Sequence, residues 1–379
     1  MIRLVGSFAA LLVVAFSARG ALAYPQFQLS ADGAQRCNQC HFSPSGGTLI
    51  NGYGRSQTGD TLAAGGNGGL LHGKLTLPEW LALGGDLRGA FVASDVGETE
   101  GPQVALFPMQ GDAYLHAGGG GVSFNATVGL RGSARGDRAS YPERTTSREH
   151  YLMWQSGNGE GAYVRAGRFL LPYGLRLVEH VTYVRRFLGQ NLLEEPYALS
   201  GGYIKNDWEL HVSAFTPFVI APVGQRGSGG VVYYENRLSD SAILGGQARV
   251  SIAGEQRTFQ GGLVGKYFLE KPKLLTMGEL DVVRQQFPKV PGGAGRSQLV
   301  SYLGVFWVPL GGYFGGLAWE RYDEDLAVRD VARDSFSVQA HWWPVAHLEL
   351  LLYGRAQFNG GGDAGDPAKM VMLQIHYWL

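Results

Sequence analysis

Apolar and polar residues alternate along most of the chain beyond residue 80. In the segment VSFNATVGLR, residues 122–131, every even-numbered residue is apolar and every odd-numbered residue is polar or glycine. The same period of two recurs in 335–342 and around Leu348, Leu350 and Leu352. A period of two predicts strands that meet lipid on one face and water on the other.

Runs of this kind predict an all-β fold, a transmembrane antiparallel β-barrel of about sixteen strands. The predicted strands are 84–93, 103–118, 121–132, 147–156, 160–169, 197–205, 207–215, 230–238, 241–252, 256–268, 272–286, 297–308, 311–323, 333–343, 346–358 and 368–379.

The lengths of the connections support a barrel over a soluble β-sandwich or propeller. Long connections follow the odd-numbered strands, and short ones follow the even-numbered strands, except for the brief link at Ala253-Gly254 after the ninth strand. Outer-membrane barrels show this asymmetry because their periplasmic turns are short and their extracellular loops are long. The longest connection, 170–196 with Arg176, Arg185 and Arg186, is therefore expected outside the cell. Trp342, Trp343, Tyr377 and Trp378 are expected in a periplasmic aromatic girdle.

Charge composition gives no support for a nucleic-acid partner. Lys and Arg together number 32, as do Asp and Glu, and glycine supplies 58 of the 379 residues without a Gly-X-Y repeat. The first residues, 1–23, join Arg3 to an apolar run and a small-residue site that ends at Ala23, which predicts a secretory signal peptide. A membrane anchor is the alternative, but the run is shorter than the ~20 residues that a spanning helix needs.

The two cysteines of the chain lie in the sequence Cys37-Asn38-Gln39-Cys40-His41. This is the C-x-x-C-H attachment pattern of a c-type haem, in which two thiols bind the porphyrin and the histidine is the proximal ligand of the iron. A disulfide or thioredoxin-like redox pair is an alternative, but it is expected beside a βαβ pattern, which is not seen. Half of a zinc site is another, but a second cysteine pair is missing.

The motif predicts that the N-terminal part of the chain is a small segment organised around one covalent haem c. We expect a monohaem cytochrome c segment at 24–61, a linker at 62–83 that contains GGNGG, and the barrel at 84–379. Arg55 is a candidate for contact with a haem propionate. Because Met109 is the first methionine after Met1, and alternation puts it on the lipid face with Ala105, Phe107 and Leu115, we expect a histidine as distal ligand. His72 is the first candidate, followed by three lumen-facing histidines, His116, His341 and His376.

The combination of one CxxCH segment, a glycine turn with Tyr53-Gly54-Arg55 and a single barrel resembles the fused outer-membrane monohaem cytochrome-porins of the extracellular iron-oxidation type. Cys37, Cys40, His41, Pro44 and Gly54-Arg55 carry the resemblance, whereas Tyr53 stands where that family usually has Phe. The resemblance implies electron transfer between an extracellular donor or acceptor, such as ferrous iron, and a periplasmic cytochrome or other carrier. An iron:cytochrome c reductase type of activity would follow from it.

The residues alone lead to a compatible expectation. A sixteen-stranded barrel leaves an aqueous lumen unless a segment fills it, and the haem segment has the right size to plug or cap that lumen from the periplasmic side. We therefore expect a bacterial outer-membrane protein, in contact with lipid, that transfers electrons through the haem. Two alternatives remain at this point: a porin for small solutes in which the haem plug is structural, and a haem peroxidase.

Overall fold

The computed structural model describes residues 25–30, 33–34, 36–47, 49–95, 101, 103–132, 144–157, 159–217, 227–287, 295–309, 311–360 and 367–379. The predicted signal peptide, 1–23, lies outside the described residues. Within the described residues, no helix is both long and apolar enough to cross a membrane.

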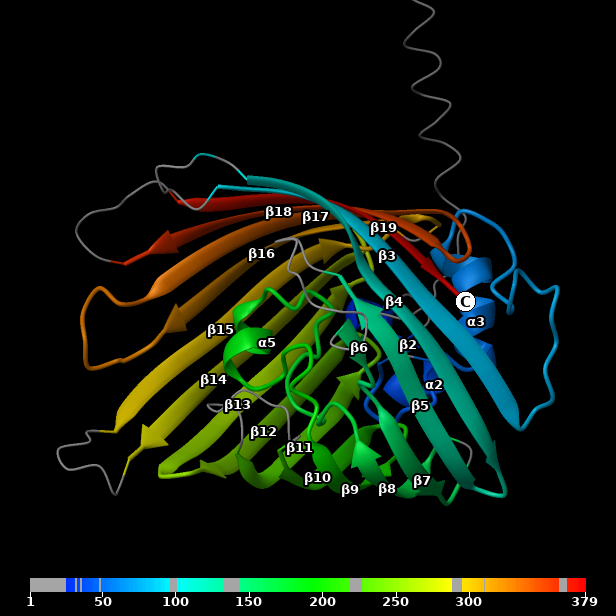
Figure 1. The fold of residues 1–379 in the computed structure, drawn as a ribbon, viewed down its shortest axis with the longest axis horizontal. Helices are drawn as coiled ribbons and strands as arrows, with labels where there is room; N and C mark the ends of the chain where they lie inside the picture. The colour runs from blue at the N-terminus through cyan, green and yellow to red at the C-terminus, as the bar shows by residue number, and fades with distance from the viewer. Residues whose placement is uncertain are drawn as a thin grey trace, which may run out of the picture.

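A closed antiparallel β-barrel makes up most of the molecule (Figure 1). Among the described residues, β6 and β7 both pair with β5, so seventeen strands occupy sixteen positions in the wall and β19 closes the ring against β3. The prediction of a barrel of about sixteen strands is confirmed. The wall consists of β3 (Leu81–Asp95), β4 (Gln103–Gly119), β5 (Val122–Arg131), β6 (Thr145–Thr146), β7 (His150–Gln155), β8 (Gly161–Arg168), β9 (Tyr197–Ile204), β10 (Trp208–Thr216), β11 (Ser228–Ser239), β12 (Ala242–Ala253), β13 (Gln256–Leu269), β14 (Leu274–Gln286), β15 (Arg296–Trp307), β16 (Tyr313–Asp323), β17 (Arg333–Val345), β18 (Leu348–Asn359) and β19 (Ala368–Trp378).

Short elements precede the barrel and fold against its interior. They are η2 (Pro25–Phe27), β1 (Leu29–Ser30), β2 (Gly33–Ala34), α2 (Cys37–Cys40), α3 (Gly52–Gln57) and the π-helical turn η3 (Thr58–Leu62). One further helix, α5 (Tyr183–Phe187), belongs to the connection between β8 and β9.

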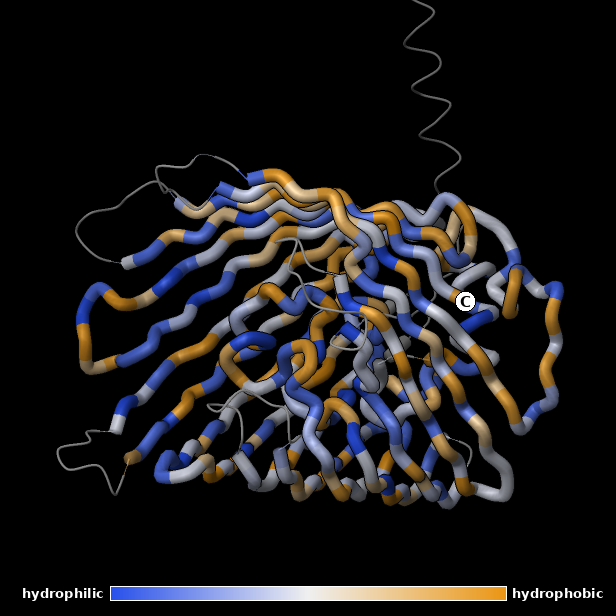
Figure 2. Tube along the Cα trace, viewed as in Figure 1, coloured by the Kyte–Doolittle hydropathy of each residue, from blue (hydrophilic) through white to orange (hydrophobic). Residues whose placement is uncertain are grey.

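The barrel has its apolar side chains outside and many of its charged side chains inside. Leu106 is 82% exposed and Leu317 is 65% exposed, whereas Glu209 and Glu320 are 0% exposed. Figure 2 shows apolar and polar residues alternating along many of the strands. A soluble protein would bury such leucines, so this distribution is that of a barrel surrounded by lipid.

The aromatic girdle differs from the prediction at two residues, Trp343 and Trp378, and Trp378 lines the interior cavity beside His376. Trp342 is exposed and stacks on Tyr313, with ring centroids 6.5 Å apart. Trp343 is 1% exposed and instead packs against Phe27, with ring centroids 5.9 Å apart. Because adjacent residues of a strand point to opposite faces, only one of the two tryptophans can face lipid. The predictions for Trp343 and Trp378 were wrong.

A β-bulge reverses the predicted facing of Met109. Arg88 pairs with Gln110 but Gly89 pairs with Pro108, so Met109 is the extra residue in β4. A bulge changes which residues face inward on its two sides. Phe107 and Met109 consequently line an interior cavity, and the prediction that both face lipid was wrong.

The longest connection, 169–196, folds back into the barrel instead of extending from it (Figure 1). Tyr173 Oη donates a hydrogen bond of 2.6 Å to Asp281 Oδ1, and the Leu175 amide donates one of 2.8 Å to Glu279 Oε2. On the far side of the lumen, Arg355 Nη1 donates to the carbonyl oxygen of Val181 at 2.9 Å. We call 169–196 the inner loop. Its predicted place as an external loop is therefore corrected.

Candidate functional site

The CxxCH motif forms a single helical turn that a neighbouring helix holds in place. Asn51 accepts a hydrogen bond from the Gly54 amide at 2.9 Å, which caps α3, and its Nδ2 donates to the Gln39 carbonyl oxygen at 2.8 Å. Gly54 lies so close to α2 that a β-carbon there would overlap the carbonyl oxygen of Cys40. The glycine of the Tyr53-Gly54-Arg55 sequence thus allows α3 to pack directly on the motif.

Arg165 of the barrel wall binds the chain just after the motif. The arginine is 1% exposed, and its two terminal nitrogens donate to Ser43 Oγ at 3.0 Å and Ser45 Oγ at 2.8 Å. Its guanidinium also lies 3.8 Å from the centroid of the Phe169 ring. This buried contact fixes the motif against the inner face of β8.

The chain before the motif binds another part of the wall. Gln28 Nε2 donates to Glu235 Oε1 at 2.6 Å, and Lys266 donates to the Gln28 side-chain oxygen. Lys266 and Glu235 form an ion pair of 2.9 Å whose side chains are each 1% exposed. The amide of Gln28 therefore completes a buried charged pair that projects inward from β11 and β13.

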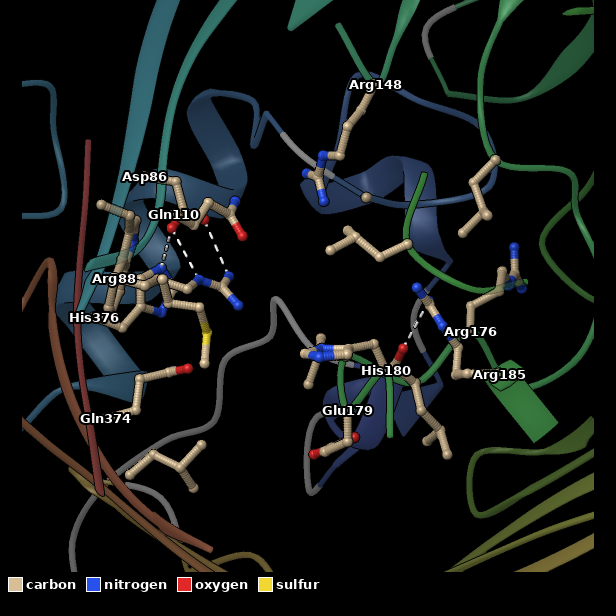
Figure 3. Close-up of a pocket in the computed structure, with 18 of the residues that line it drawn as sticks. Asp86, Arg88, Gln110, Arg148, Arg176, Glu179, His180, Arg185, Gln374 and His376 are labelled. Atoms are coloured by element: carbon tan, nitrogen blue, oxygen red, sulfur yellow. Dashed lines mark hydrogen bonds and ion pairs between the residues drawn. The ribbon is translucent and has the colours of Figure 1, made fainter. Parts of the chain in front are cut away.

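A cavity of about 650 Å³ lies between the motif segment, the inner loop and the wall (Figure 3). Its volume falls within the range of about 300–1,000 Å³ that is typical of small-molecule and cofactor sites. Residues of the motif segment line one side of it: His41, Ser45, Gly46, Gly47, Leu49 and Ile50. The inner loop contributes a second side: Leu170, Leu171, Arg176, Leu177, Val178, Glu179, His180, Val181, Arg185, Leu192, Leu193 and Glu195.

The inner loop contributes His180 to this cavity. In Figure 3 the His180 ring points into the open space, with Glu179 beside it and Arg176 and Arg185 behind it. Desolvation, reinforced by Arg185 and more distant arginines, lowers the pKa of His180 to about 4. The imidazole is thus neutral at physiological pH.

A chain of ionisable side chains lines the opposite wall. His376 Nδ1 lies 2.7 Å from Glu349 Oε2, and its Nε2 lies 3.0 Å from Asp86 Oδ1. The other oxygen of Glu349 lies 2.5 Å from His341 Nδ1. Asp86 Oδ1 in turn accepts from Arg88 Nε at 2.9 Å. Carboxylates thus hold both histidines in fixed orientations.

Of the three predicted site residues in the motif, only His41 lines the cavity. Cys37 and Cys40 do not line the cavity; Cys40 is 3% exposed, and burial raises its pKa to about 12. Arg55 donates to the carbonyl oxygen of Leu83, and it does not line the cavity. His72 also lies elsewhere, with Nε2 at 3.2 Å from Tyr377 Oη.

The three barrel histidines named from the sequence differ in their surroundings. His116 stacks on Phe42, with centroids 3.7 Å apart, and its Nδ1 lies 2.8 Å from Asn125 Oδ1. His341 and His376 line the cavity. Sequence reasoning missed His180 because the inner loop was expected outside. The only sequence signal was the apolar character of so long a connection, which includes Leu170, Leu171, Leu175, Leu177, Val178 and Val181.

The residues at the motif fit a c-type haem chemically. Both thiols are free, three residues apart in one helical turn, and followed directly by an imidazole. Gly46, at φ +76°, lines the cavity next to Cys37; a β-carbon there would stand 3.6 Å from Cys37 Sγ. Elsewhere, the described residues contain no group of three or more His, Cys, Asp or Glu side chains that could hold a metal ion.

Comparison with solved structures identifies the architecture. OprB of Pseudomonas putida superposes with a TM-score of 0.60 at 12% identity, over 79% of this chain and 94% of that one. The fold is that of an outer-membrane porin. The anion-selective porin of Comamonas acidovorans gives a TM-score of 0.57 at 17% identity, over 79% and 99% of the two chains. The outer-membrane channel DcaP of Acinetobacter baumannii gives 0.55 at 11% identity, over 79% and 97%. No protein-family model and no curated protein matches the sequence.

Proposed function

We propose that this protein is a bacterial outer-membrane barrel that binds a c-type haem inside its lumen and transfers electrons across the membrane. The observation that carries the proposal is the position of the CxxCH segment: the motif lies against the inner face of the wall, and His41 lines the interior cavity. When bound, a haem supplies a one-electron carrier. The outer membrane otherwise separates an external donor from periplasmic carriers by an insulating layer.

The side chains of the motif have defined roles in this proposal. Cys37 and Cys40 hold the cofactor through thioethers, and His41 is the proximal ligand of the iron. Arg165 fixes the segment after the motif through Ser43 and Ser45. Because this anchor is buried, the motif keeps one position relative to the cavity. Arg55 as a propionate contact remains a prediction.

Ferrous iron outside the cell is the proposed donor. It would lose one electron to become ferric iron, and an oxidised cytochrome or other carrier in the periplasm would gain that electron. This assignment of the donor follows from the resemblance to cytochrome-porins, and the fold does not indicate which donor the protein uses.

A porin for small solutes is the second candidate, and the fold comparisons on their own favour it over electron transfer. The cavity supplies a specific observation for it. Five arginines line the cavity together with four carboxylates, which gives the lining an excess of positive groups: Arg88, Arg131, Arg148, Arg176 and Arg185 against Asp86, Glu149, Glu179 and Glu195. Such a lining attracts anions, and one structural neighbour is described as anion-selective.

Proteoliposomes distinguish the two candidates. We would entrap oxidised cytochrome c inside, add ferrous citrate outside and follow the absorbance of the reduced cytochrome. Electron transfer predicts reduction with the native protein and none with the Cys37→Ala/Cys40→Ala variant. Osmotic swelling in small sugars and organic acids measures solute passage in the same vesicles. Equal swelling with both proteins, without any cytochrome reduction, would support the solute porin and reject electron transfer.

A further inference from the structure

Several side chains that can ligate iron line the same cavity as His41. Besides His41 itself they are His180, His341, His376, Met109, Met370 and Met372. A haem held by His41 in this cavity would find its second protein ligand in this set, and His72 does not line the cavity. The geometry of each candidate decides between them.

Two of the three histidines already bind a carboxylate. Glu349 lies 2.5 Å from His341 Nδ1 and 2.7 Å from His376 Nδ1, and Asp86 lies 3.0 Å from His376 Nε2. Turning either ring toward an iron would break a buried contact and leave Glu349, which is 1% exposed, with one partner fewer. These histidines are therefore poor ligands.

The inner loop and the motif segment are hydrogen-bonded to each other at residues close in sequence to His180 and His41. Arg176 Nη1 donates to the carbonyl oxygen of Ser45 at 3.0 Å. His180 lies four residues after Arg176, and His41 lies four residues before Ser45. In Figure 3, Arg176 and Arg185 lie on the same side of the cavity as His180.

The His180 ring is also accessible from the cavity. It is exposed to the lumen, and within the described part of the chain it has no hydrogen bond or ion pair. The methionines differ in that they project from the fixed wall, Met109 from β4 and Met370 and Met372 from β19. Only His180 is carried by a segment that crosses the lumen and binds the motif segment directly.

We propose that His180 is the second axial ligand of the haem iron, opposite His41. The inference rests on the proposed haem. It assigns a second purpose to the inner loop, which brings a ligand from the connection between β8 and β9 to the N-terminal motif. The result is a bis-histidine iron, whose potential is lower than that of a methionine-ligated one.

Spectroscopy of the purified full-length protein tests the assignment. The oxidised native protein should give a low-spin bis-histidine EPR signal and lack the red charge-transfer band of methionine ligation. His180→Ala should lose the low-spin signal and gain a high-spin one. His180→Met should restore a low-spin iron, show the methionine band and raise the potential. His72→Ala is the matched control and should change nothing.

Three outcomes would overturn the assignment, and they differ in what else they affect. A methionine band in the native protein would move the ligand to Met109, Met370 or Met372. An unchanged spectrum in His180→Ala, with the haem still bound, would reject His180 alone. Absence of covalent haem, measured by the pyridine haemochrome spectrum, would reject both this inference and the proposed function. Heat-modifiable migration on gels shows whether each variant still forms the barrel.

Discussion

Arg176 of the inner loop donates a hydrogen bond of 3.0 Å to the carbonyl oxygen of Ser45, four residues beyond the CxxCH motif. The same guanidinium lies 3.7 Å from Glu209 Oε1, and its Cζ lies 4.9 Å from the centroid of the Tyr233 ring. One arginine thus joins the inner loop, the motif segment and the wall strands β10 and β11. Neither the loop nor the motif segment has a large core of its own, so each depends on such contacts.

Replacing Arg176 tests this dependence. Arg176→Ala removes a buried cation from Glu209, which is 0% exposed, and leaves the Ser45 carbonyl without this donor. Glu209 keeps its contacts with His211 at 3.4 Å and Arg237 at 3.6 Å. We therefore expect a loss of about 1–3 kcal/mol in unfolding free energy, the usual cost of leaving a buried polar group without its partner. Urea unfolding in detergent micelles measures it. Arg186→Ala, at an exposed position of the same loop, should stay within ~0.5 kcal/mol of the native protein.

A second prediction concerns the buried ion pair between Lys266 and Glu235. Lys266→Met leaves Glu235 without its cation, with an expected cost of about 3–5 kcal/mol. Gln28→Ala keeps the ion pair but removes the amide that bonds both partners, and should cost only about 1–3 kcal/mol. The same unfolding assay ranks the two variants. Equal stability of Lys266→Met and the native protein would contradict the buried pair.

The thiol of Cys40 predicts a pH-dependent reactivity. Burial raises its pKa to about 12, above the ~8.5 of a free cysteine, so the folded protein prefers the protonated form. At pH 8 the Cys40 thiol is therefore almost entirely protonated. In protein made without haem attachment, iodoacetamide should therefore modify Cys40 slowly at pH 8 and faster as the pH rises. Unfolding in urea should restore ordinary reactivity.

Mass spectrometry also distinguishes this free thiol from a thioether. In the haem-bound protein, neither Cys37 nor Cys40 should be alkylated even after unfolding. Rapid modification of Cys40 in the folded, haem-free protein at pH 8 would contradict its buried position.

The inner loop predicts different accessibility of two connections on intact cells. In a Cys37→Ala/Cys40→Ala background, Val328→Cys lies in an exposed connection between β16 and β17, whereas Leu188→Cys lies in the inner loop at a site that is 0% exposed. A bulky maleimide reagent should label Val328→Cys and leave Leu188→Cys unlabelled until the barrel is unfolded. Labelling of Leu188→Cys at the same rate would contradict the folded-back loop.

The strands were predictable because apolar and polar residues alternate along a strand that has lipid on one face and the lumen on the other. Leu106, Leu317 and Val122 face outward and are exposed, as their alternation indicates. Met109 was missed because an extra residue in β4 changes facing without changing composition. Trp343 was misplaced by treating two adjacent aromatic residues as one signal, although neighbours in a strand face opposite sides.

The candidate site was predictable only where the chemistry is local. Cys37, Cys40 and His41 are adjacent in sequence, and α2 keeps them together. His180 depends on the path of the inner loop, which is set by contacts far apart in sequence, such as that between Tyr173 and Asp281. No local pattern indicates which long connection of a barrel returns to the lumen.

The most direct test of the account is whether the protein carries covalent haem on its motif. The native protein should be made in cells with a cytochrome c maturation system, run on a denaturing gel and stained for haem peroxidase activity. We predict a haem band at the mature mass that disappears in the Cys37→Ala/Cys40→Ala variant while the barrel still forms. A folded native protein without the band, or a variant that still stains, would contradict a lumenal c-type haem and the electron transfer proposed from it.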